Sequence, residues 1–267
     1  MNQPSERPVP PGIDTSVPHP ARVWDYWLGG KDHFAADRAA GEDLLAAMPD
    51  WVEVARADRQ FLARAVRYLV REAGIRQFLD IGTGIPTADN THEVAQALAP
   101  DSRIVYVDHD PIVLVHARAL LTSTPEGATD YIDADLRDPG AILEQAAKTL
   151  DFSRPVAVTL LAILEFLPDD AEARPIIDRL LAALPSGSHL VIAQPVHSPA
   201  IDEAARRWNA SGGAQVSARS PERLAAFFTG LELVEPGLVP LPKWRPDERT
   251  SYTDRDIPSY GAVGRKP

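Results

Sequence analysis

Two periodicities of apolar and polar residues divide this chain into strand-like and helix-like segments. Short runs of strand-forming residues lie at 77–81, 103–107, 129–133, 156–161 and 189–193. Between them, apolar positions three or four residues apart predict amphipathic helices at 88–98, 111–121, 139–149 and 169–184. Strands that alternate with helices in this way predict a mostly parallel sheet with helices on both faces.

The beginning of the chain departs from this alternation. Residues 1–17 are rich in proline and have little to pack, so we expect a disordered tail. Residues 18–75 form an N-terminal helical cap beside the carboxyl end of the first strand, and residues 76–267 form a Rossmann-like domain. The predicted helices of the cap lie at 21–28, 35–48 and 52–72.

The end of the Rossmann-like domain combines further helices with two antiparallel strands. The helices are predicted at 199–210 and 221–229, and the strands at 231–236 and 260–265. The stretch 240–258 is rich in proline and charge, so we expect a surface loop. With the five parallel strands, this pair predicts a seven-stranded sheet.

A glycine turn and an acid follow the first two strands. Gly82, Thr83 and Gly84 come directly after the first strand, and Asp108 ends the second. Glycine lets the backbone approach a ligand closely, and an acid at the tip of the next parallel strand can accept hydrogen bonds from ribose hydroxyls. We therefore expect a nucleoside site at the carboxyl edge of the sheet, against the alternative of a tight turn without a ligand.

The residues of the turn favour a nucleoside without a diphosphate. Thr87 stands where the dinucleotide fingerprint has its third glycine, and Pro86 removes a backbone N–H from the turn. Asp80, just before the first glycine, would repel a pyrophosphate but would suit an ammonium group. S-adenosylmethionine carries such a group and no phosphate, so it fits better than a nicotinamide dinucleotide.

The charge and composition of the chain exclude several classes of protein. The net charge of −11 disfavours a protein that holds nucleic acid by bulk charge. No cysteine is present, so there are no thiolate metal sites. We expect no membrane span, because no apolar run of about 18 residues occurs, and no secretory signal. These features, with abundant arginine and alanine, lead us to expect a cytoplasmic bacterial protein.

Several motifs spread along the chain together resemble one family. They are the segments at 21–34, 37–38, 80–87, 90–95, 105–111, 134–139, 185–188 and 244–246. In these motifs the chain from about Pro18 to Lys266 resembles the S-adenosylmethionine-dependent methyltransferase family formerly known as DUF574. The resemblance implies a class I methyltransferase-like fold and S-adenosylmethionine as cofactor, and it names no acceptor.

The resemblance assigns cofactor contacts to the strand ends. Asp80 and Gly82 would meet the amine and the carboxylate of the methionine moiety, with Thr83 in the same turn. Gly84 would let the ligand lie against bare backbone, and Asp108 would hold the ribose hydroxyls through charge-assisted bonds.

Three residues of the next strand ends would surround the adenine. His109 would flank the ring, and Asp135 with Leu136 would meet its exocyclic amine. Asp135 has the alternative of a helix N-cap or turn acid, because a helix is expected to begin shortly after it.

The N-terminal motif is interpreted as a lid. Gly29 and Gly30 would make backbone contacts with the cofactor, and Tyr26 or Phe34 would form a wall of the pocket. The alternative is a capped helix with a solvated loop. Arg38, Arg56 and Arg59 are candidate partners for the methionine carboxylate or for an acidic acceptor, and each has a salt bridge to a local Asp as the alternative.

Candidate catalytic residues lie at the edge that faces the transferred methyl. Glu165, where relatives commonly carry His, could act as a general base or hold a cationic acceptor, or it could be an exposed strand-end acid. His197 is a second candidate, although a lone loop histidine is more often inert. His92, Glu93 and His116 lack the spacing of a ligand set, so we expect no metal.

We therefore predict an S-adenosylmethionine-dependent methyltransferase that acts on a small-molecule acceptor, not on nucleic acid. The acceptor, the attacked atom and the oligomeric state are left open. A protein that binds the cofactor or its demethylated product without catalysis is the first alternative. A nicotinamide-dependent oxidoreductase is the second.

Overall fold

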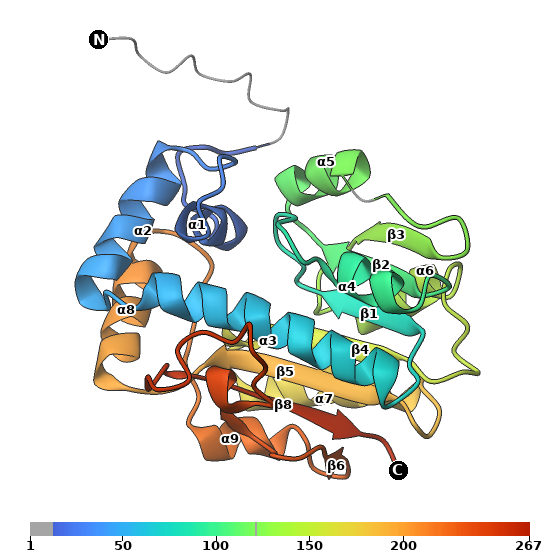
Figure 1. Ribbon diagram of the computed structural model, residues 1–267. Coiled ribbons are helices and arrows are strands. Elements are labelled where there is room, and N and C mark those ends of the chain that lie inside the picture. Colours follow the sequence, from blue (N-terminus) through green and yellow to red (C-terminus); the bar gives the residue numbers. More distant parts are fainter. Residues whose placement is uncertain (1–12, 121) are drawn as a thin grey trace.

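The computed structural model describes residues 13–120 and 122–267, and its centre is one twisted sheet (Figure 1). The strand order is β3-β2-β1-β4-β5-β8-β6, and β7 pairs with β8 at Gly261 and Tyr260. The strands are β1 Gln77–Ile81, β2 Arg103–Asp108, β3 Ala128–Asp133, β4 Ala157–Leu161, β5 His189–Pro195, β6 Glu232–Leu233, β7 Val239–Pro240 and β8 Ser259–Arg265. The first five are parallel and the last three join through antiparallel pairs. The predicted class I methyltransferase fold is confirmed, with the two-residue β7 as an addition.

Helices cover both faces of the sheet. The α-helices are α1 Pro20–Trp27, α2 Ala35–Ala47, α3 Trp51–Arg71, α4 Thr91–Leu98, α5 Pro111–Leu120, α6 Pro139–Ala146, α7 Asp170–Ala182, α8 Pro199–Ala210 and α9 Pro221–Ala226. Two 3₁₀ turns, η1 Leu164–Phe166 and η2 Leu241–Lys243, complete the helical elements of the described residues. No helix within the described ranges is long and apolar enough to cross a membrane.

Alternation along each strand divides the core into two layers. Phe78 belongs to the cluster under α3 and α4, whereas its neighbour Leu79 belongs to the cluster under α6, α7 and α9. Successive side chains of a strand point to opposite faces, so a fully buried parallel strand must be apolar at both. The predicted cap, residues 18–75, has two parts in the structure. Helix α3 lies along the sheet, whereas α1 and α2 lie beyond the strand ends (Figure 1).

Two predicted segments differ in the structure. Residues 1–12 of the expected disordered tail lie outside the described residues. Ile13 packs against Ile85 and α5, and Arg22 donates to the carbonyls of Asp14 and Val17, so the end of that segment is ordered. The expected surface loop at 240–258 is also wrong in part, because it contains the fully buried Trp244.

A buried arginine explains why that segment packs inward. Arg64 of α3 donates from Nε to the Trp244 carbonyl at 2.9 Å and from Nη2 to the Leu241 carbonyl at 2.6 Å. Trp244 also meets Phe61 edge to face. Burial lowers the pKa of Arg64 to about 10, so it stays cationic at neutral pH. These contacts join positions about 180 residues apart, which local sequence patterns do not encode.

Arg64→Met should therefore lower the free energy of unfolding by about 2 kcal/mol, because two buried carbonyls lose a charged donor. Arg67→Met is the matched control, since Arg67 on the same helix makes only a partly exposed ion pair with Asp247 of the same segment. The control should lose less than about 1 kcal/mol. Urea unfolding of both variants measures the difference, and equal losses would contradict the anchoring role of Arg64.

Candidate functional site

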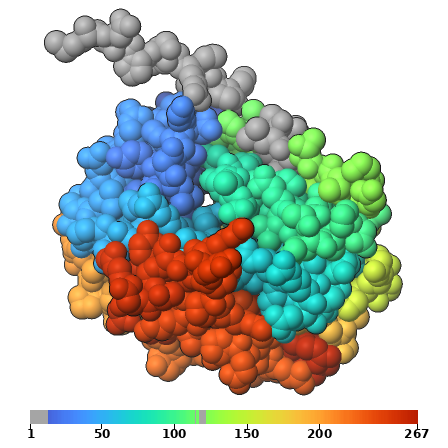
Figure 2. Space-filling view, viewed as in Figure 1, coloured from blue at the N-terminus to red at the C-terminus, as the bar shows by residue number. Residues whose placement is uncertain are grey.

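A cavity of about 470 Å³ lies at the carboxyl ends of β1, β2 and β4. Figure 2 shows the surface hollowed where the blue N-terminal segment meets the green part of the chain. The predicted cofactor residues that line this cavity are Asp80, Gly82, Thr83, Gly84, Asp108, His109, Asp135 and Leu136. The glycine turn and the strand-end acids therefore converge on one site, although they come from separate strands.

Asp108 organises the glycine turn. Its Oδ2 accepts from the Gly84 N–H at 2.8 Å, and its Oδ1 accepts from the N–H groups of His109 and Asp110 at 2.8 and 3.0 Å. Gly82 has a φ of 77°, and a Cβ there would lie 2.7 Å from the Ile163 side chain. Hydrogen bonds from backbone N–H groups to the Asp108 carboxylate thus hold the turn, and this carboxylate keeps lone pairs for hydroxyl donors from a ligand.

Asp80 is held by two hydroxyl groups. Thr91 of α4 and Thr159 of β4 each donate to its carboxylate at 2.6 Å. Burial raises the pKa of Asp80 even though both hydroxyls stabilise its charge. The carboxylate therefore fastens β1 to α4 and β4 at the cavity wall, and its contact with a cofactor ammonium group stays a prediction.

Asp58 is a second buried carboxyl at the cavity, and it is not among the residues predicted from the sequence. Burial, with the charge of Asp80 added, raises the pKa of Asp58 to about 7. The side chain sits on the inward face of α3, four residues after Val54 and three before Phe61. An acid at helical spacing within an apolar stripe was the available signal.

Arg59 lies next to Asp58 and also lines the cavity. Its Nη2 donates to the carbonyls of Ala88 and Asp89 at 3.1 and 3.0 Å, so the local salt bridge considered as its alternative role is not what holds it. Its buried Nε has no hydrogen-bond partner among the described residues. A cationic group with a spare buried donor suits a ligand carboxylate.

The cavity is covered by α1, but not by the residues predicted for the lid. His19, Trp24, Asp25 and Leu28 line the cavity together with Pro20 and Ala21. The His19 Nδ1 lies 2.8 Å from the Asp110 carboxylate and so connects α1 to α5.

Tyr26, Gly29 and Gly30 are not among the lining residues, which corrects their assignment. The Tyr26 hydroxyl donates to Glu42 on α2. Gly29 and Gly30 cap the C-terminal end of α1: their N–H groups donate to the carbonyls of Tyr26 and Asp25, respectively. A Cβ at Gly30 would overlap the Asp25 carboxylate, so this glycine serves close packing at the helix end.

The structure places the two candidate catalytic bases, Glu165 and His197, in different surroundings. His197 lines neither this cavity nor its neighbour; its side chain is 64% exposed and its Nδ1 lies 2.8 Å from Asp202, so it is not placed for catalysis. Glu165 lines a second, adjoining cavity. Between β4 and η1, Ala162 adopts a left-handed φ of 49°, a strained conformation that is common at functional sites.

The cavity thus combines two buried carboxyls, a cationic side chain with a spare donor, an acid on a glycine turn and apolar walls. This set fits a molecule that carries an ammonium, a carboxylate, a ribose and a flat base. Together with the parallel sheet and its antiparallel β8, the site defines a class I methyltransferase.

The sequence model of the S-adenosyl methyltransferase family matches residues 6–267, so the chain belongs to this family, whose cofactor is S-adenosylmethionine. A DUF574 family protein from Streptomyces avermitilis is 48% identical, with 95% of this chain and 99% of that chain covered and a TM-score of 0.91. A protein from Thermobifida fusca YX, described as a candidate methyltransferase, is 43% identical over 96% and 98% of the chains, with a TM-score of 0.88. No curated protein matches this chain.

A more distant structure shows the shared fold. Magnesium protoporphyrin IX methyltransferase from Synechocystis, with bound S-adenosylhomocysteine, is 12% identical over 92% of this chain and 93% of that chain, with a TM-score of 0.54.

The pKa of Asp58 predicts how stability depends on pH. The folded state holds this proton more tightly than the unfolded state, whose Asp has a pKa of 3.8. The stability that the protonated Asp58 contributes to the folded state is fully present below pH 3.8 and is lost as the pH rises toward about 7. Asp58→Asn should therefore stabilise the ligand-free protein by about 1–3 kcal/mol more at pH 8 than at pH 5.

Urea unfolding at the two pH values measures this difference. The control is Asp101→Asn, whose carboxylate is 61% exposed and has no comparable desolvation cost to relieve. An equal effect of Asp58→Asn at both pH values would show that the Asp58 carboxyl is not destabilised by burial.

Proposed function

We propose that this protein transfers the methyl group of S-adenosylmethionine to a small-molecule acceptor. The observation that carries the proposal is the convergence of Asp58, Arg59 and Asp108 on one cavity at the glycine turn. The net charge of −11 supports a small acceptor over nucleic acid, because the chain lacks the excess of cations that phosphate backbones require.

Each of these residues has a distinct task in binding. Asp108 accepts the ribose hydroxyls while its backbone bonds hold the turn in place. Arg59 pairs with the methionine carboxylate through its spare donor, and Asp58 receives the ammonium group together with Asp80, which lines the same cavity. Pairing with an ammonium offsets the cost of ionising a buried carboxyl, so the cofactor stabilises the charged form of Asp58.

The bound cofactor supplies a methyl group made electrophilic by the sulfonium charge. The protein then has to align the acceptor with this methyl and exclude water. The lid α1 suits the second task, because Trp24 and Leu28 line the cavity and the contact between His19 and Asp110 holds the lid against α5.

Calorimetric titration with S-adenosylmethionine, S-adenosylhomocysteine and NAD tests the cofactor. We expect the first two to bind and NAD not to bind. Asp108→Asn should weaken both by about tenfold or more, because it removes the charge that the ribose hydroxyls and the Gly84 N–H share.

Asp133→Asn is the matched control, since Asp133 ends the neighbouring strand in register with Asp108 but is exposed and does not line the cavity. Its affinities should be those of the unmodified protein. Tight NAD binding would favour an oxidoreductase. Cofactor binding without methyl transfer to any pool of small metabolites would favour a non-catalytic binder.

A further inference from the structure

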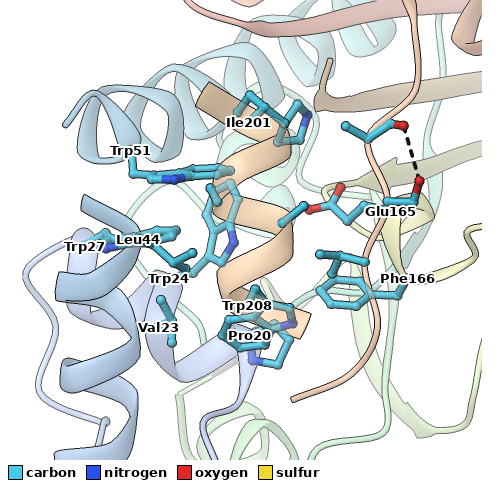
Figure 3. Close-up of a pocket in the computed structure, with 16 residues that line it drawn as sticks. Pro20, Val23, Trp24, Trp27, Leu44, Trp51, Glu165, Phe166, Ile201 and Trp208 are labelled. Carbon is cyan, nitrogen blue, oxygen red and sulfur yellow. Dashed lines mark hydrogen bonds between the residues drawn. The ribbon is translucent and has the colours of Figure 1, made fainter. Parts of the chain in front are cut away.

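A second cavity adjoins the cofactor cavity. It measures about 70 Å³ and lies among α1, α2, the start of α3, η1 and α8 (Figure 3). Four of the chain's five tryptophans line it: Trp24, Trp27, Trp51 and Trp208. Pro20, Trp24 and Phe166 line both cavities, so the second cavity adjoins the first at these side chains.

Glu165 is the one charged side chain among the described residues that line this cavity. In Figure 3 it points toward the cavity from the side opposite Trp27 and Trp51. The residue is half-buried, but its Oε2 is shielded from solvent and has no hydrogen-bond partner among the described residues. Burial, followed by the charge of Asp58, raises the pKa of Glu165 to about 8. A buried carboxyl oxygen without a partner is costly, so a hydrogen-bond donor from a ligand would be stabilised at this position.

The nearest cation does not fill this role. Arg219 donates from Nε to Asp170 at 2.6 Å, from Nη1 to the Leu164 carbonyl at 2.7 Å and from Nη2 to the Leu167 carbonyl. These bonds hold η1 in place and leave the Glu165 carboxyl to the cavity.

The walls select the charge and size of the ligand. A carboxylate or phosphate would face Glu165 without any cationic side chain to balance it. Indole rings attract cations through their faces, and four of the side chains that line this cavity are indoles. The volume is about half of the roughly 150 Å³ that holds a benzene ring, so the group that enters must be compact.

Building on the proposed function, we infer that the second cavity is the acceptor site and that it binds the amine end of an alkylamine, with Glu165 as the group that takes the ammonium proton. The proton moves from the nitrogen to the Glu165 carboxylate. The freed lone pair forms the new N–CH₃ bond, and the S–CH₃ bond breaks with its electron pair going to sulfur. The product leaves as an N-methylated ammonium, and Glu165 releases its proton to solvent.

The first test compares three ligands of nearly equal size: n-propylamine, n-propanol and propionate. Each is titrated into protein saturated with S-adenosylhomocysteine, and tryptophan emission reports occupancy because four indoles line the cavity. We expect n-propylamine to bind about tenfold or more tightly than the other two. Formation of N-methylpropylamine from S-adenosylmethionine is followed in parallel by mass spectrometry.

The second test uses Glu165→Gln, which keeps the shape of the side chain but cannot take the proton. It should weaken n-propylamine by about tenfold or more and leave S-adenosylhomocysteine unchanged, which also verifies its folding. Glu222→Gln, an exposed acid at the start of α9 and outside both cavities, is the control and should bind both ligands normally.

The outcomes separate the two hypotheses. If the unmodified protein binds neither S-adenosylmethionine nor S-adenosylhomocysteine, the proposed function itself fails. If it binds them but prefers n-propanol or propionate, or if Glu165→Gln binds n-propylamine as well as before, the amine assignment is overturned and the cofactor assignment stands. The ligand comparison requires no variant, so it decides the question even where Glu165→Gln does not fold.

Discussion

The carboxylate of Asp108 is the interaction on which the site depends. It satisfies three backbone N–H groups at once, those of Gly84, His109 and Asp110, and thereby fixes the glycine turn against the end of β2. Asp110, oriented in this way, accepts from the Ile112 N–H in the first turn of α5 and meets His19 at the start of α1. One charged group thus connects the ligand turn, a sheet-covering helix and the lid, so the shape of the cofactor cavity and the position of its cover are set together.

Buried charges are used in two opposite ways in this protein. Arg64 and Arg219 are buried cations whose donors are met by backbone carbonyls, and each anchors a segment that has little regular structure of its own. Asp58 is a buried acid and Glu165 a half-buried one; burial raises their pKa values to about 7 and about 8, and both face a cavity. The two arginines therefore stabilise the fold. The two acids destabilise it at neutral pH, and their role in ligand binding explains why they lie at the cavities.

The sequence predicted the parallel strands and the glycine turn because both depend on local patterns, a run of strand formers and a glycine next to an acid. It predicted the lid helix but not which side of it faces the cavity, since Tyr26 and Trp24 are equally plausible walls until α2 is in place. Asp58 was not predicted because the charged Arg56 and Arg59 flank it in the sequence, as on a solvated helix face, and only its spacing from Val54 and Phe61 places it on the inward face. The inward packing of Trp244 depends on Arg64, and a pair so distant in the chain leaves no periodic signal.

The helix α1 has one further consequence for how the two cavities work together. Pro20 and Trp24 line both of them, so any movement of α1 that opens the cofactor cavity also changes the walls of the second. The contact of His19 with Asp110 holds α1 at its N-terminal end, and Arg22, buried beside Asp37, holds it to α2. Binding in the first cavity would stabilise this arrangement, and the indole walls of the second cavity would then already be in position when the acceptor arrives. Pre-formed walls reduce the ordering cost of binding, so the lid of one site serves as the scaffold of the other.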